Sequence, residues 1–369
     1  MFNMPDQRLH VEKNHSASMV LKQQQSLLWF LFFLICLGLG HAPLNRYDPG
    51  KLTGTTDVAD YEDIVVGRRG QPAPGSIGLY ARINEAQNLN RVLVPYVAKP
   101  FYWLGRGHIG TWDPALFGLL VANAIFTATT GCLLVVIGYR LTLGFLTALL
   151  GATLFLLNFC VTNYSLAGMV DSAEGCFLLV IVWSLLTGRW FLLPLWGVFG
   201  ALAKETFAPI SAMFVFGWWV SEVRRDRLQL PHLAWMSALG VVSMATVTLV
   251  MSTVAGGLVW PWQYAAFVHD PTSFLTGLRE CIFNHGFWYI FIWLLPVGLV
   301  RVRRLPRPWV LATVVAFCGV LAMGAYNNAG GSTSRALFSV AGPLLSLSTA
   351  VFLAGPQAAK EERNGPTGL

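Results

Sequence analysis

Charged side chains are scarce in this chain. Asp, Glu, Lys and Arg make up 12% of the 369 residues, against about 25% in an average soluble domain. Hydrophobic residues make up 55%, and they collect in apolar runs of the kind that cross a membrane. This composition disfavours a water-soluble globule and predicts a polytopic membrane protein.

Patterns that hold metals or nucleotides are also missing. The six cysteines form no C-x-x-C pair, no His/Cys cluster has the spacing of a zinc site, and no glycine-rich phosphate loop is present. Most of the cysteines lie within or beside apolar runs, where a structural thiol is expected. The sequence therefore assigns no cofactor, and the need for a divalent cation stays open.

Acidic residues are fewer than basic ones, and the formal net charge is +7. The basic residues fall mainly in short clusters between apolar runs, where positive charge orients membrane helices, so the excess does not indicate a nucleic-acid partner. The apolar runs predict an all-α transmembrane bundle of about ten helices, and no internal repeat is visible. Their approximate positions are 26–42, 114–138, 141–161, 173–188, 190–203, 206–222, 233–256, 287–301, 308–325 and 336–354.

The distribution of Lys and Arg predicts the sidedness of the chain. If the N-terminus is inside, the cytoplasmic segments carry 14 basic residues and the short outer segments carry only Lys204, Arg279 and Arg335. The long outer loop 43–113 carries eight more, but long loops cross the membrane largely regardless of their charge. We therefore expect both termini in the cytoplasm and a multi-pass protein of the plasma membrane, the inner membrane of a bacterium.

This sidedness divides the chain into three parts. Residues 1–25 are expected to form a cytoplasmic N-terminal segment, residues 26–354 the transmembrane domain and residues 355–369 a cytoplasmic tail. Within the transmembrane domain, residues 43–113 form a large first extracytoplasmic loop that should contain short interfacial helices. The unusual polar residues then fall on the outer face, where we expect the function to lie.

The first outer loop contains the stretch DVADYED, with Asp57, Asp60, Glu62 and Asp63 in seven positions. Carboxylates this dense at a membrane surface are costly unless they face water, a cation or a substrate. In a helix that starts here, Asp57, Asp60 and Tyr61 would share one face. One carboxylate could then act as a general base. A capped, solvated interfacial helix is the alternative.

The segment LNRVLVPYVAKPFYWLGRG (89–107) interleaves cations with aromatic rings. This pattern is typical of an amphipathic helix at a membrane surface. We expect Pro95 and Pro100 to break it into short pieces. Arg91 or Lys99 could hold the phosphate of a lipid-linked substrate, and a plain membrane anchor is the alternative.

Two later outer segments carry charges of both signs. Asp171 and Glu174 are expected on one face at the start of a helix, where negative charge is also favoured by the helix dipole. Lys204 and Glu205 lie between two apolar runs, where the pair could neutralise itself or Lys204 could bind a phosphate.

Two further residues complete the set of site candidates. Arg335 is expected to begin the final helix, where a cation opposes the helix dipole, so a carboxylate of another loop or a substrate phosphate should compensate it. His269 lies in the outer loop 257–286. No second His has the spacing of a metal ligand, so His269 is treated as a supporting residue and not as a metal ligand.

The order and sidedness of these segments resemble those of the C-type (GT-C) integral-membrane glycosyltransferases, which are related to the protein O-mannosyltransferases and to the enzymes that add aminoarabinose to lipid A. The matching segments are Asp57-Val-Ala-Asp60-Tyr61, Arg91-Val-Leu-Val-Pro95, Asp171, Gly200-Ala-Leu-Ala-Lys204-Glu205-Thr206, and Arg335 with Pro343. Each segment is short and degenerate, so their order along the chain carries the resemblance. With about ten helices and no soluble C-terminal domain expected, the chain would depart from the larger relatives of this group.

The resemblance implies transfer of a sugar from a polyprenyl-phosphate donor to a lipid, glycan or protein acceptor, with inversion at the sugar carbon. Asp57 or Asp60 would be the general base, and Arg91, Lys204 and Arg335 would stabilise the leaving phosphate. Tyr61, Asp171, Glu174, Glu205 and His269 are supporting candidates. The other hypotheses are a secondary transporter or lipid flippase, and a non-catalytic scaffold of an envelope polysaccharide pathway.

Overall fold

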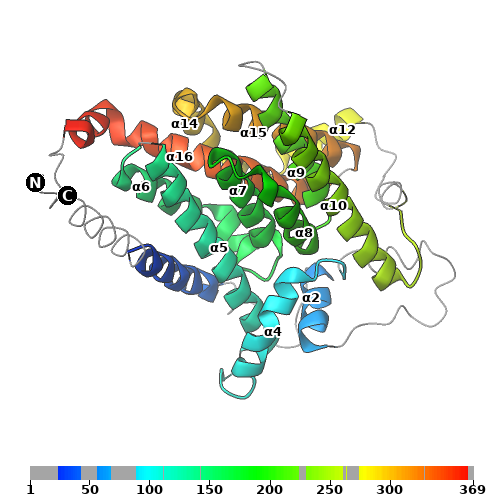
Figure 1. Ribbon diagram of the computed structural model, residues 1–369. Coiled ribbons are helices and arrows are strands. Elements are labelled where there is room, and N and C mark those ends of the chain that lie inside the picture. Colours follow the sequence, from blue (N-terminus) through cyan, green and yellow to red (C-terminus); the bar gives the residue numbers. More distant parts are fainter. Residues whose placement is uncertain are drawn as a thin grey trace, which may run out of the picture.

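A computed structural model describes residues 24–42, 56–67, 89–110, 112–141, 143–223, 230–260, 263, 274–327 and 329–364. Helices form the regular structure throughout these ranges, and no strand occurs in them (Figure 1). The prediction of an all-α fold is therefore confirmed for this part of the chain.

Each of the ten apolar runs coincides with helical structure. The first run forms the N-terminal helix Gln24–Ala42. The helices that follow are α2 (Thr56–Val66), α4 (Leu93–Gly105), α5 (Pro114–Arg140), α6 (Phe145–Leu156), α7 (Asp171–Leu186), α8 (Leu193–Ala203), α9 (Phe207–Val223), α10 (Leu230–Ala255), α12 (Phe274–Phe283), α13 (His285–Phe291), α14 (Leu294–Arg301), α15 (Arg307–Tyr326) and α16 (Gly330–Asn364). Short π or 3-10 turns are η1 (Val161–Ser165), η2 (Trp190–Leu192) and η3 (Val302–Arg304).

Five helices of the described chain are long and apolar enough to cross a membrane. They are Gln24–Ala42, α5, α10, α15 and the Gly330–Gly355 part of α16. A sixth crossing results if α13 and the α14–η3 segment, bent by 43°, form one span. The helices α6, α8 and α9 are shorter than the roughly 20 residues of a full crossing. The count of ten crossings is thus not confirmed, although a multi-pass membrane protein accounts for this set of helices.

The helices differ in how much of their surface lies inside the protein. The apolar window of α16 is 83% buried and that of α5 is 67% buried, whereas the windows of α10 and the N-terminal helix are 28% and 17% buried. An apolar helix that neighbouring helices do not cover is suited to contact with lipid. Most residues of α7 are also buried, so the core of the bundle forms around α5, α7 and α16.

Helices α2 and α4 lie together at one end of the bundle, beside the start of α5 (Figure 1). The expectation that two prolines break α4 is wrong, because one helix spans Leu93–Gly105. Pro95 lies in the first turn, where its missing N–H would have no helical partner, and Pro100 is accommodated inside the helix at the loss of one hydrogen bond.

The close approach of α4 to α5 depends on a glycine. A Cβ atom built on Gly118 would lie 2.8 Å from the carbonyl oxygen of Ala98, which is a backbone atom and cannot rotate away. This contact fixes α4, and with it the residues just before α4, against the central helix α5.

Candidate functional site

Arg91, two residues before the start of α4, lies at the centre of a polar network at this end of the bundle. Its Nε and NH2 atoms donate to the two carboxylate oxygens of Glu205 at 2.8 and 2.6 Å. Its NH1 atom donates to the hydroxyl of Tyr61 at 2.7 Å and lies 3.8 Å from Asp57. A two-point bond between a guanidinium and a carboxylate is both strong and directional, so Arg91 is held in one orientation.

Helix α2 contributes Asp57 and Tyr61 to this network. Tyr61 is completely buried, whereas the side chain of Asp57 is 29% exposed. Because the two residues are four apart in the helix, they lie on one face, as the sequence predicted. Asp60 is half-buried on the same helix. The outer edge of the network is therefore acidic and reachable from solvent.

Asp171, the first residue of α7, joins two cations that are far apart in the sequence. Its Oδ1 atom accepts a hydrogen bond from Lys204 at 2.5 Å, and its Oδ2 atom accepts one from Arg335 at 3.0 Å. Lys204 also lies 3.5 Å from Glu174, whose other oxygen accepts a hydrogen bond from Thr206 at 2.6 Å. Asp171 and Glu174 thus share a face at the start of α7, as expected.

We call these groups the ion-pair cluster. Its members are Asp57, Tyr61, Arg91, Asp171, Glu174, Lys204, Glu205 and Arg335. Three cations face three buried carboxylates, and Asp57 adds a fourth carboxylate at the edge. Buried charges are tolerated when each has a partner of opposite sign, and the loss of one partner leaves the other uncompensated.

The surroundings set the charge state of the cluster. Burial raises the pKa of Tyr61 to about 12, although Arg91 acts in the opposite direction, so the phenol stays neutral. Burial would raise the pKa of Glu205, but the charge and hydrogen bonds of Arg91 outweigh burial and hold that pKa below its usual value. Burial would lower the pKa of Lys204, but Asp171 and Glu174 outweigh it and raise that pKa. Glu205 and Lys204 therefore remain charged at neutral pH.

Arg335 occupies a different position from the one expected. Helix α16 begins at Gly330, so Arg335 lies in its second turn and does not begin the helix. Of the two compensating anions that the sequence allowed, the structure contains the protein carboxylate, Asp171. The Arg335 guanidinium also lies over the ring of Tyr164, 5.5 Å from its centroid.

Sequence reasoning did not find Tyr164 or Thr206 as members of this environment. Tyr164 lies in η1, a single π-helical turn, and such turns often occur at functional sites. The local sequence NYSLAG contains no pattern that predicts a π turn. Thr206 directly follows Lys204 and Glu205, and its place within the segment AKET was the available signal.

Most of the predicted site residues are brought together by the fold. Arg91 bonds to Glu205, whereas Lys204 and Arg335 both bond to Asp171, and the two groups lie together because Lys204 and Glu205 are neighbours in the sequence. His269 lies outside the described residues. No group of three or more His, Cys, Asp or Glu side chains that could hold a metal ion occurs in the described chain.

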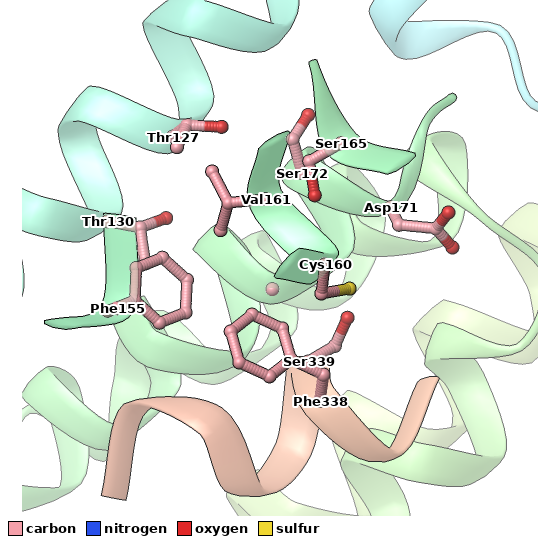
Figure 2. A pocket seen from close by; sticks show the side chains of 11 residues that line it. Thr127, Thr130, Phe155, Cys160, Val161, Ser165, Asp171, Ser172, Phe338 and Ser339 are labelled. Atoms are coloured by element: carbon pink, nitrogen blue, oxygen red, sulfur yellow. The ribbon is translucent and has the colours of Figure 1, made fainter. Parts of the chain in front are cut away.

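A small cavity adjoins the cluster at Asp171, which is one of its lining residues (Figure 2). Its volume is about 20 Å³, and its walls come from α5, α6, η1, α7 and α16. The stacked rings of Phe155 and Phe338, 5.2 Å apart, form an apolar wall, while Thr127, Ser165 and Ser172 supply hydroxyl groups. This space holds roughly one water molecule and excludes a sugar ring.

No family model, curated protein or solved structure matches the chain.

Proposed function

We propose that the chain is a membrane glycosyltransferase of the GT-C type. It would move a sugar from a polyprenyl-phosphate donor to an acceptor hydroxyl on the extracytoplasmic face. The observation that supports this proposal most directly is the position of Asp57, a part-exposed carboxylate 3.8 Å from the buried cation Arg91. A group able to take a proton thus belongs to the same cluster as Arg335, a cation able to stabilise negative charge.

The proposed reaction needs these two functions at one place. The acceptor oxygen attacks the anomeric carbon of the sugar, the bond from that carbon to the donor phosphate breaks, and the phosphate leaves with the electron pair. Asp57 or Asp60 takes the proton of the acceptor hydroxyl, and nearby cations stabilise the leaving phosphate. A single displacement of this kind inverts the configuration of the sugar carbon.

The hydrogen bonds suggest that the three cations have different roles. Arg91 uses its Nε, NH1 and NH2 atoms on Glu205 and Tyr61, and Lys204 is enclosed by Asp171 and Glu174. Arg335 donates through NH1 to Asp171 and makes no other hydrogen bond within the described residues. We therefore assign the donor phosphate to Arg335, and regard Arg91 and Lys204 as positioning residues.

The transporter and scaffold hypotheses gain no specific support. A transporter commonly binds its cargo near the middle of the membrane, often at interrupted helices in two related halves. Here the charges lie near helix ends: Asp171 begins α7, Lys204 directly follows α8, and Arg335 is in the second turn of α16. This placement favours a site at the end of the bundle.

The proposed activity is tested by mass spectrometry of lipid-linked sugars and envelope glycans from cells with and without the protein. The expected result is a glycan that loses one sugar in the deletion strain, together with accumulation of a polyprenyl-phosphate sugar. Restoration by the wild-type gene, but not by a gene encoding Asp57→Asn with Asp60→Asn, assigns the loss to the site. An unchanged glycan and lipid profile would contradict the proposal.

A further inference from the structure

A dense basic turn lies between two apolar helical segments, away from the residues of the ion-pair cluster in the sequence. Arg301 ends α14, Arg303 and Arg304 belong to η3, and Arg307 begins α15. We call these four residues the arginine turn. Arg303, Arg304 and Arg307 are exposed, and Arg301 is half-buried. None of the four has a carboxylate partner within the described residues.

The fold holds this turn in a defined shape. Leu305, between the arginines, is 3% exposed and Trp309 is 1% exposed, so the turn is fastened to the bundle from its inner side. Ser348 of α16 donates a hydrogen bond to the carbonyl of Gly298 in α14, which fixes the helix that leads into the turn. The charged groups are therefore presented on an ordered scaffold.

The neighbouring helices place the turn at a membrane surface. Helix α15 has 20 residues and is apolar enough to cross a membrane, and the bent pair that ends at Arg304 passes the same test as one span. Leu299 and Val300, just before Arg301, are 54% and 60% exposed, which suits contact with lipid tails. A basic turn at the junction of such segments lies at headgroup depth, whichever side of the membrane it faces.

Within the described residues these four arginines have no carboxylate partner, so at that depth they are available to bind anions. Arginine binds phosphate through two parallel N–H donors, and basic clusters next to membrane helices attract acidic lipids. Arg307 also lies in the first turn of α15, where the helix dipole disfavours a cation and a bound anion would remove the conflict. We propose that the arginine turn is a binding site for the phosphate groups of anionic phospholipids.

The test uses the purified full-length protein in detergent, titrated with phosphatidylglycerol or with phosphatidylcholine, with bound lipid counted by native mass spectrometry. The wild-type protein is expected to prefer phosphatidylglycerol, and added sodium chloride should reduce that preference. The triple variant R303Q/R304Q/R307Q should bind phosphatidylglycerol at least tenfold more weakly, since each interfacial arginine contributes on the order of a fivefold change. Binding of phosphatidylcholine should change little.

Two further variants separate the proposal from its alternatives. R106Q/R140Q/R279Q removes the same number of charges from exposed arginines on three separate elements and should weaken phosphatidylglycerol binding less than threefold. R303K/R304K/R307K keeps the charge and should retain most of the binding even if the glutamine variant folds poorly. Equal losses in the two glutamine variants, or wild-type binding that salt does not affect, would overturn the proposal. Displacement of bound phosphatidylglycerol by millimolar inorganic phosphate would also overturn it, because the site would then recognise free phosphate.

Discussion

At the scale of single residues, Asp57 is the most exposed carboxylate of the ion-pair cluster, and this exposure gives it access to a substrate. Asp57→Asn and Asp60→Asn keep the side-chain shape and remove the charge. We expect one of them to lower the transfer rate by about a hundredfold or more, the effect of losing a general base, while the melting temperature stays near that of the wild type. Asp63→Asn, on the same helix, is the matched control. Wild-type rates in both variants would refute the general-base assignment.

Because the buried cations have different contacts, their substitution should have different effects on stability and on donor use. Lys204→Met leaves Asp171 and Glu174 with one fewer cation, and we expect it to lower the free energy of unfolding by about 3–5 kcal/mol, the usual cost of breaking a buried pair. Arg335→Gln leaves Asp171 paired with Lys204. It should therefore destabilise the protein less, while raising the donor concentration needed for half-maximal transfer.

This comparison needs denaturation in detergent and initial rates at varied donor concentration. Arg279→Gln, an exposed arginine on α12, serves as the surface control and should change neither quantity appreciably. If Arg335→Gln has the same half-saturating donor concentration as this control, the assignment of the phosphate to Arg335 is wrong.

At the scale of helices, the contact between α4 and α5 determines where Arg91 lies. Gly118→Val would drive its side chain into the backbone of Ala98, and overpacking of this kind costs about 1–3 kcal/mol. We expect the variant to lower the melting temperature and to reduce activity, because a shifted α4 displaces Arg91 from Glu205 and Tyr61. Gly240→Ala on α10 is the control, since a Cβ there meets no atom within 4 Å. Equal melting temperatures for the two variants would contradict this account.

At the scale of the whole molecule, the sidedness predicted from Lys and Arg is open to direct measurement. In a protein without native cysteines, a single cysteine introduced at Gly75 should react with a membrane-impermeant maleimide added to intact spheroplasts. A single cysteine at Arg227 should react only after the membrane is permeabilised. The reverse pattern would place the first loop and the proposed site on the cytoplasmic face.

The sequence by itself determined that the chain is helical, with several helices apolar enough to cross a membrane, and it gave the approximate positions of ten helical runs, but it missed α12 in the expected outer loop 257–286. Apolar runs predict helices because a backbone in lipid must satisfy its own hydrogen bonds, and all ten runs proved helical. The local spacing also placed Asp57 and Tyr61 on one face and Asp171 with Glu174 at a helix start, since these relations depend only on the period of a helix.

The tertiary structure decided which charges meet and how deeply they are buried. Arg91 bonds to Glu205, 114 positions away, and Arg335 bonds to Asp171, 164 positions away. No local pattern encodes such distances. Surrounding helices also decide two local features. One is the π turn that places the Tyr164 ring against Arg335, and the other is the continuation of α4 past Pro100. Long-range packing selects among the partners that each charge could have, because in a buried site only arrangements that pair every charge are low in free energy.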